Sequence, residues 1–332
     1  MSYQPDRVHF RTPTYKRPVA LRRALQSMIA QTSEDWVCDV YDDDPAEAAR
    51  QVVAELGDPR IHYRANKPQL YASRNIDHCF CADNPRAAEF FCVVEDDNFL
   101  DPEFCAENIA MARRAGVEIV LRNQVIEYAS GTADARVGST GVLDDLFNEG
   151  VYDAQEFRLA LLAGIGVSNG GLFWSVRARS LLEIQYACTA TLQEYLRTYS
   201  IAEPVYVAMQ PLAVWAENAG QTTRNAGLDA GYLRRELDLK RAVQVLRQQV
   251  WGETSRAQRA EFLTNPRFAA PVEVRASHIG KALIGQRLAG HVSPVAALRL
   301  RARGLMIRSL GRLTPEFDRF VASRSRGPFQ PA

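Results

Sequence analysis

The sequence lacks any long apolar segment. In its 332 residues no run approaches the ~20 apolar residues of a membrane-spanning helix. The first residues also lack the apolar core that is typical of a signal peptide, so we expect a cytoplasmic protein. With 47% hydrophobic and 24% charged residues, the composition is that of a globular protein with a sizeable core. At ~150 residues per domain, the length allows one large or two smaller domains.

Cysteine and histidine are scarce, with six and five residues respectively. In a cytoplasmic protein we expect the cysteines to be reduced core residues rather than disulfides. His78, Cys79 and Cys81 are spaced like half of a zinc site. No second cysteine pair follows at the spacing of a zinc finger, so this pattern does not favour zinc.

Strand-like and helix-like segments alternate along the first two thirds of the chain, which predicts an α/β fold with a mostly parallel sheet flanked by helices. Strands are predicted at 7–11, 36–41, 60–64, 90–94, 117–128, 172–176 and 205–215. Helices are predicted at 18–30, 46–56, 71–81, 101–115, 153–163, 189–199, 232–250, 255–262, 277–288 and 294–310. The pattern is irregular at 129–150, and a glycine-rich bend follows at 164–171.

The run Phe90–Val94 leads directly into the carboxylates Glu95, Asp96 and Asp97. Such a short apolar run predicts a strand that is buried on both faces. In open α/β sheets the carboxyl ends of strands carry ligand-binding groups. Adjacent carboxylates repel each other unless a cation compensates them, and hard oxygen ligands suit Mg²⁺ or Mn²⁺. The alternative interpretation is an acidic cap, because Asp97 or Asn98 could precede a helix that starts near residue 101.

Four motifs occur in the order that is typical of one enzyme family. They are "FRTPTYKRP", "SMIAQTSEDWVCDVYDDDP", "YASRN" and "FFCVVEDDNFLDPEF". Together they resemble the family 2 glycosyltransferases of GT-A fold, which use nucleotide-diphosphate sugars. The resemblance covers roughly residues 6–225. It implies a Rossmann-like catalytic domain at 1–225, with a nucleotide-binding half at about 1–128 and an acceptor half at about 129–225. A helical, basic region would follow at 226–332.

The resemblance also implies roles for individual residues. An aromatic face stacks on a base without reading a particular edge, and a metal that bridges the diphosphate stabilises the leaving group. The implied roles fall on Pro13, Thr14 and Tyr15 (nucleotide base), Asp43 (edge of uracil), Arg74 (diphosphate), Asp96 (ribose) and Asp97 (Mn²⁺ or Mg²⁺, and so catalysis).

The second half of the chain departs from the family pattern. The family base is an Asp at the start of a late helix, but this chain has no Asp from 154 to 228. Glu194 is nearest the corresponding place, so we expect it to be the base. Many members also carry a metal-binding His, and here Asn218 occupies that place, as a weaker ligand. The other acids in this part of the chain are Glu156, Glu183, Glu203 and Glu217.

From this resemblance we expect transfer from a UDP-sugar to a glycan or lipid-linked acceptor, metal-assisted and inverting, as in polysaccharide biosynthesis. The alternative is a related protein that binds a nucleotide sugar or glycan without transfer, because the usual base and His are missing. A nucleotidyltransferase is disfavoured, since its glycine-rich opening loop is absent from this sequence.

Charge is unevenly distributed, although the net charge is only +1. Residues 275–332 contain 11 Lys and Arg but 2 Asp and Glu, whereas the remainder contains 29 and 37. This asymmetry indicates an anionic partner for the tail. Within 294–313 one helical side gathers Leu298, Ala302, Leu305, Met306, Leu310 and Leu313, and Arg299, Arg303, Arg308 and Arg312 lie elsewhere. This side is expected to pack on the rest of the chain or a second subunit, or else on a membrane. Nucleic acid is disfavoured, as no aromatic platform accompanies the arginines.

Overall fold

The computed structural model describes residues 3–217, 230–288 and 290–325. Within them, one sheet contains β1 (Gln4–Thr14), β2 (Trp36–Asp42), β3 (Ile61–Ala65), β4 (Ala88–Val93), β5 (Phe99–Leu100), β6 (Ile119–Tyr128), β7 (Arg136–Gly141), β8 (Gly150–Tyr152), β9 (Leu172–Ser175) and β10 (Val205–Ala216). The helices are α1 (Pro18–Ile29), α2 (Ala48–Leu56), α3 (Tyr71–His78), α4 (Phe104–Ala115), α5 (Ala154–Arg158), α6 (Ala160–Ala163), α7 (Ala190–Ser200), α8 (Ala230–Glu253), α9 (Arg256–Glu261), α10 (Val272–Ala282), α11 (Pro294–Leu310) and α12 (Pro315–Arg324), with short 3₁₀ turns η1 (Asn169–Gly171) and η2 (Phe262–Thr264).

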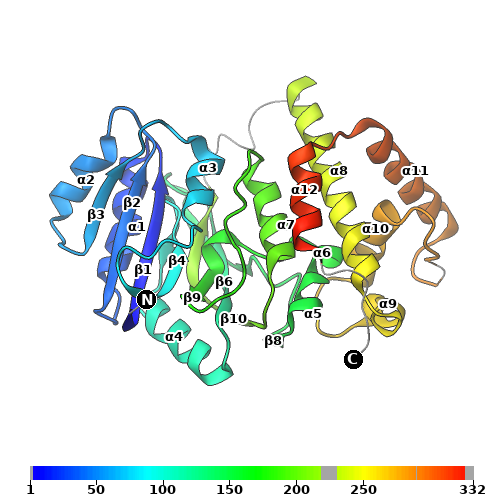
Figure 1. Cartoon of the computed structure of the whole chain (residues 1–332), viewed down its shortest axis with the longest axis horizontal. Coiled ribbons are helices and arrows are strands. Elements are labelled where there is room, and N and C mark those ends of the chain that lie inside the picture. The colour runs from blue at the N-terminus through cyan, green and yellow to red at the C-terminus, as the bar shows by residue number, and fades with distance from the viewer. Residues whose placement is uncertain (1–2, 218–229, 289, 326–332) are drawn as a thin grey trace.

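The strand order is β3-β2-β1-β4-β9-β6-β10-β5, with β7 beside β6 and β8 beside β10. The strands β3, β2, β1 and β4 are parallel to one another, and so are β6 and β10. Between these two blocks lies β9, which is antiparallel to both of its neighbours. The predicted α/β fold is confirmed, with this antiparallel strand as the refinement. Figure 1 shows the sheet at the left and centre, and the helices α8 to α12 gathered at the right.

Both faces of the sheet are buried, and alternation along β4 shows how. Phe90 and Cys92 face α1, α2 and α4, whereas Phe91 and Val93 face the side of α6, α7 and α8. This follows from the period of two in a strand, which sends successive side chains to opposite faces. An apolar run without polar interruptions is therefore what a central strand of this fold requires, as the sequence predicts.

The strand and helix predictions differ from the structure mainly in the second half of the chain. The stretch 129–150, expected to be irregular, contains β7 and β8, which pair with β6 and β10. The predicted helix 277–288 is instead α10, which begins after Pro271 and ends before Leu283. Its start carries a proline at the cap and Glu273 in the first turn, a signal that the apolar spacing alone does not register. Helix α12 is not predicted at all.

The helices after residue 229 pack on the same core as the sheet. Ala242 and Leu246 of α8, Ile279 of α10 and Phe317 of α12 belong to one apolar cluster with residues of β4, β6 and α7. The predicted domain boundary at 225 lies outside the described residues, so this division of the chain stays a prediction. Among the helices that the structure describes, none combines the length and apolar character needed to span a membrane.

Candidate active site

Thr14 connects three strands at the carboxyl end of the sheet. Its main-chain oxygen accepts a hydrogen bond from the N–H of Asp43 at 3.0 Å, just after β2. Its hydroxyl donates to Oδ2 of Asp96 at 2.8 Å, just after β4. The N–H of Tyr15 reaches the same oxygen at 3.3 Å. Parallel pairing of β1 with β2 and β4 brings these ends together, so the structure gathers Thr14, Tyr15, Asp43 and Asp96 as the family resemblance implies.

Arg17 neutralises part of the acidic turn. Its Nη1 donates to Oδ2 of Asp97 at 2.7 Å and to Oδ1 of Asp96 at 3.3 Å. Arg23, six residues further along the chain in α1, donates to the main-chain oxygen of Asp97 at 3.1 Å and to Glu127. The turn is thus held by two arginines of the β1–α1 segment. The "TYKRP" motif contains Arg17, but its spacing does not assign this side chain to Asp97.

Asp43 has a second partner, the segment that leads into α3. Its carboxylate accepts hydrogen bonds from the N–H of Leu70 at 2.6 Å and the N–H of Tyr71 at 2.7 Å, and from the Asn66 side chain at 3.2 Å. Asp43 therefore orients the start of the helix that carries Arg74. A carboxylate can accept about four hydrogen bonds, so a nucleobase edge remains within its capacity.

The exposed candidates for nucleotide contact lie around this centre. The Tyr15 side chain is 43% exposed, with Lys16 Nζ 5.0 Å from its ring centroid. Pro13 pairs with Tyr41 of β2 one residue before the end of β1 and is buried, so only its main chain is available. Arg74 is exposed on α3. An exposed aromatic ring and an exposed cation beside buried carboxylates are suited to a base and a phosphate, respectively.

Glu194 approaches the acidic turn from the other half of the chain. It lies in α7, and its Oε1 is 3.5 Å from the N–H of Asn169 in η1. Its charge also acts on Glu95, since burial, followed by Asp97, Glu194 and Asp96, raises the pKa of Glu95 to about 8. The structure therefore places the expected base opposite the acidic turn of β4.

Two other carboxylates from the same part of the sequence have structural partners instead. Glu203 accepts hydrogen bonds from the N–H groups of Arg179 and Ser180. Glu156 is paired with Arg267. Neither contact involves the acidic turn, which leaves Glu194 as the better placed of these three acids.

Glu95 is a site residue to which the sequence pattern assigns no role. It is the first carboxylate of the run, and strand alternation is the signal that could find it. Phe91 and Val93 face the side of α7. Glu95, two positions further, continues that side toward Glu194. Its raised pKa favours the protonated form of Glu95, which can donate a hydrogen bond.

A buried arginine fixes the elements around Glu194. Arg197 donates to Asp77 Oδ1 at 2.6 Å and to Asn169 Oδ1 at 2.8 Å, and its guanidinium lies 3.8 Å from the ring centroid of Phe80. Arg197 is fully buried. It thereby ties α3, η1 and α7 together, and it holds Asn169 beside Glu194.

The carboxylates fit a hard divalent cation only in part. Within the described residues, no three His, Cys, Asp or Glu side chains are grouped so that they could hold a metal by themselves. Asn218, the expected further ligand, lies outside those residues. Yet burial and Asp97 raise the pKa of Asp96 to about 6, even though Arg17 acts in the opposite direction. Arg17 therefore does not fully compensate the negative charge of Asp96 and Asp97. The oxygens of Asp97 suit Mg²⁺ or Mn²⁺ if a ligand supplies further oxygens.

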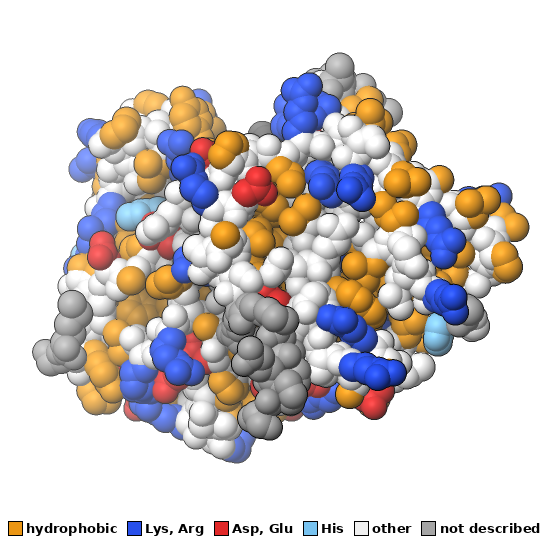
Figure 2. Space-filling model, turned by 45° about the vertical axis from the view of Figure 1, so that its right-hand side comes forward, with side chains coloured by type: hydrophobic (Ala, Val, Ile, Leu, Met, Phe, Trp, Pro, Cys, Tyr) orange, Lys and Arg blue, Asp and Glu red, His pale blue; other side chains and the backbone are white. Residues whose placement is uncertain are grey.

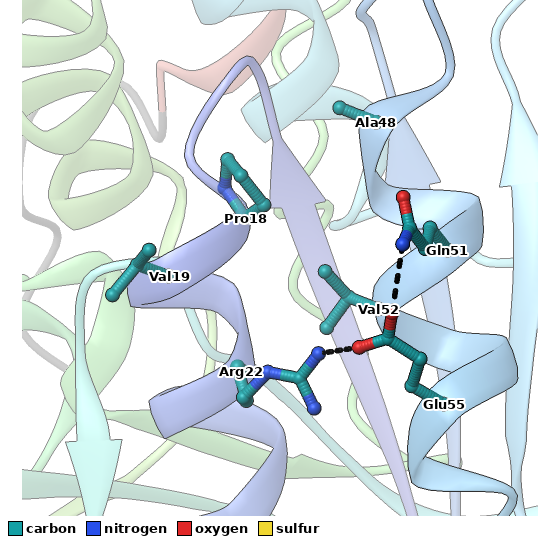
Figure 3. Close-up of a pocket in the computed structure, with 7 residues that line it drawn as sticks. All are labelled: Pro18, Val19, Arg22, Ala48, Gln51, Val52 and Glu55. Atoms are coloured by element: carbon teal, nitrogen blue, oxygen red, sulfur yellow. Dashed lines mark hydrogen bonds and ion pairs between the residues drawn. The ribbon is translucent and has the colours of Figure 1, made fainter.

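A surface pocket of about 270 Å³ lies between α1 and α2, apart from the acidic turn. Figure 3 shows its lining, in which Arg22 of α1 contacts Glu55 of α2 across the gap, and Gln51 contacts Glu55 within α2. Pro18 and Val19 line its other end. This pocket contains none of the predicted site residues.

The family model "Glycosyl transferase family 2" matches residues 11–166. This stretch makes up just under half of the chain. It contains Thr14, Asp43, Arg74 and the acidic turn, whereas Glu194 lies beyond the match. The resemblance that the four motifs indicate is thus confirmed. No curated protein sequence matches the chain.

Solved structures with the same fold include TarS of S. aureus. Residues 1–349 of TarS in complex with UDP-GlcNAc superpose with a TM-score of 0.54 at 12% identity, over 91% of this chain and 89% of that chain. The complex of the same protein with UDP gives a TM-score of 0.55 at 10% identity with the same coverage. At such identities the likeness shows the fold alone, which is GT-A.

Proposed function

We propose that this protein transfers a sugar from a nucleotide-diphosphate sugar, most favourably a UDP-sugar, to a hydroxyl of a glycan or lipid-linked acceptor. One observation carries the proposal: Thr14, which is hydrogen-bonded to Asp96, lies at the same end of the sheet as Asp97 and Glu194. The match of residues 11–166 to the family 2 model supports the reaction class. The GT-A proteins of similar fold in complex with UDP and UDP-GlcNAc support the choice of donor.

In this proposal the nucleotide side is built from the first half of the chain. Tyr15 stacks on the base, and Asp43 accepts a hydrogen bond from the uracil edge. Asp96 meets the ribose, and Arg74 faces the diphosphate. These contacts persist from ground state to transition state, so they serve mainly to bind and orient the donor.

Asp97, with Asn218, would hold a divalent cation together with the donor. When bound, such a cation stabilises the charge that develops on the leaving diphosphate. Arg17 must then release Asp97, because its Nη1 lies within hydrogen-bond distance of the carboxylate that the cation needs. Comparison of nucleoside diphosphate release with Mn²⁺ and with Mg²⁺ decides which ion is used.

Glu194 acts as the base. The acceptor O–H gives its proton to the Glu194 carboxylate as the acceptor oxygen attacks the anomeric carbon. The bond from that carbon to the diphosphate breaks, and the nucleoside diphosphate leaves. A single displacement of this kind inverts the anomeric centre. Asn169 and Arg197 hold α7 and η1 in place for this step.

The second candidate is a protein that binds a nucleotide sugar without transferring it. Two observations favour it: the Arg17 contact on Asp97, and a glutamate in place of the family Asp. A panel of nucleotide sugars with Mn²⁺ or Mg²⁺, read by melting shift and by release of nucleoside diphosphate, separates the two. Release that depends on the metal and is lost in Asp97→Asn supports transfer.

The matched control for this assay is Asp83→Asn. Asp83 is exposed and precedes β4, at the opposite end of the strand from Asp97. It should keep full activity. Binding of a donor without turnover on any acceptor would support the second candidate, and full activity of Asp97→Asn in the presence of a chelator would contradict the assigned role of Asp97.

A further inference from the structure

Helix α11 packs through one narrow face. Gly304 and Ile307 are buried, and Leu300 is half-buried against the core. A Cβ on Gly304 would lie 2.4 Å from the main-chain oxygen of Lys281 in α10, so the two helices approach each other closely at this point. This face of α11 therefore consists of small and medium-sized side chains, and α10 and the core already cover it.

A second apolar face of α11 points to solvent. It consists of side chains that are each between 49% and 67% exposed, namely Val295, Leu298, Leu305, Met306 and Leu310. Their spacings of three, four and seven residues place them on one stripe, and Gly304 and Ile307 lie on the other side. The expectation that this side packs on the rest of the chain is thus wrong for these residues, and only Leu313 reaches the core.

Arginines flank the exposed stripe. Arg303 lies along one edge, and Arg301 and Arg308 along the other, whereas Arg299 lies within the stripe between Met306 and Leu310, as the helical period requires. All four are exposed, and no Asp or Glu occurs anywhere from 274 to 315. Lys281 of α10 adds a further cation, since burial, followed by Arg247 and Arg303, lowers its pKa. The nearest acids on neighbouring helices lie toward the end of α11, where Asp238 of α8 accepts a hydrogen bond from the N–H of Arg312. The surface combines apolar side chains with an excess of positive charge.

We propose that this stripe, defined by Val295, Leu298, Leu305, Met306 and Leu310, docks the protein on an anionic lipid surface. A helix with apolar side chains on one face and arginines at its edges lies in the interface of a bilayer, with its apolar side inserted. The arginines are attracted to anionic headgroups. A second copy of the chain is a poorer occupant, because two such stripes in contact would bring their arginines together without any acid on the helix.

The position of α11 suits this role. It lies at the edge of the molecule farthest from β1 to β3 in Figure 1, and orange and blue side chains adjoin each other on the right-hand lobe in Figure 2. The proposal does not rest on the transfer reaction, since it concerns a surface that contains no proposed active-site residue. Where both hold, the protein would work beside membrane-borne acceptors.

The test is co-sedimentation of the full chain with phosphatidylcholine vesicles, with and without phosphatidylglycerol, at low and high salt. We expect binding to the anionic vesicles only, weakened by salt. The double variant Leu298→Glu with Leu305→Glu should lower the partition coefficient at least ~10-fold, as buried apolar area is lost. Arg299→Gln with Arg303→Gln should lower it roughly 25-fold, at about fivefold for each arginine.

The control is Val137→Glu with Leu181→Glu, because both side chains are also about half exposed, at 54% and 55%, but lie outside α11. It should bind like the wild type, and unchanged melting temperatures should show that all variants fold. Wild-type protein left in the supernatant at low salt would overturn the proposal. Binding of the Leu298→Glu/Leu305→Glu variant at the wild-type level would also overturn it. The same holds if the wild type is a dimer in solution and this double variant is a monomer.

Discussion

Arg17→Gln should increase the affinity of the free protein for Mn²⁺. A cation that binds Asp97 must displace the Arg17 guanidinium, whose Nη1 lies 2.7 Å from Oδ2 of Asp97. It must also approach against the charge of Arg17. Both effects weaken the binding of Mn²⁺. Removal of the Arg17 charge should therefore increase the affinity for Mn²⁺, whichever of the two effects is larger.

The magnitude follows from the exposure of the pair. A hydrogen bond between charged groups contributes ~1.5–3 kcal/mol when desolvated. The Asp97 side chain is 10% exposed, but that of Arg17 is 33% exposed, so solvent screening reduces the value to about 1–2 kcal/mol. At 1.4 kcal/mol for each factor of ten, the dissociation constant of Mn²⁺ should fall about 5- to 30-fold.

Titration calorimetry or the electron paramagnetic resonance signal of free Mn²⁺ measures this without any donor. The matched control is Arg22→Gln, which removes an arginine of the same helix that pairs with Glu55 instead. Its affinity for Mn²⁺ should be unchanged. An Arg17→Gln variant that binds Mn²⁺ no better than the wild type would refute the idea that Arg17 occupies the place of the cation.

Three further predictions concern the base, the nucleobase and acid stability. Glu194→Gln should keep donor affinity and lose roughly 10²-fold or more in turnover, as for a lost general base. Glu183→Gln should stay active. The reverse pattern would assign the base to Glu183. Tyr15→Ala should raise the Michaelis constant for the donor roughly 5- to 150-fold at ~1–3 kcal/mol of stacking. A large fall in kcat at constant KM would contradict this role. Burial and Arg247 lower the pKa of His278 to about 3, so the folded state excludes a proton that the unfolded chain takes up below its ordinary pKa of 6.5. The free energy of unfolding therefore decreases as pH falls from 6.5 toward 3, at ~1.4 kcal/mol per pH unit. Between pH 7 and pH 5, measured by urea unfolding, His278→Gln should lose about 2 kcal/mol less of this free energy than the wild type. Equal losses in the two proteins would contradict this role of His278.

The nucleotide half was readable from the sequence because its signals are local. The run Phe90–Val94, the cluster that contains Asp43 and the motif that contains Thr14 each end a strand, and parallel strands bring their carboxyl ends to one edge. Strand alternation also points to Glu95, but it does not predict the role of this side chain. Arg17 could not be assigned, because a long side chain on a loop chooses its partner in three dimensions.

The tail shows a different limit of sequence reasoning. Helical spacing correctly separated Leu298 and Leu305 from the arginines, but it did not say which apolar side would be covered. That choice depends on Gly304, whose missing side chain lets α11 approach Lys281. A glycine in a helix reads as a weak point by propensity, and only the neighbouring helix reveals it as a point of contact.

The insertion of β9 between β4 and β6 has a consequence for protein engineering. Leu172–Ser175 comes late in the chain, yet it separates strands that precede it and stacks Phe173 on Phe90 at 5.1 Å between ring centroids. A fragment that ends at residue 128 would leave the edge of β4 unpaired and its aromatic side chains in water. Chimeras that exchange the nucleotide-binding half with a relative must therefore carry a matching β9, and the two parts of this gene would recombine poorly at a crossover between them.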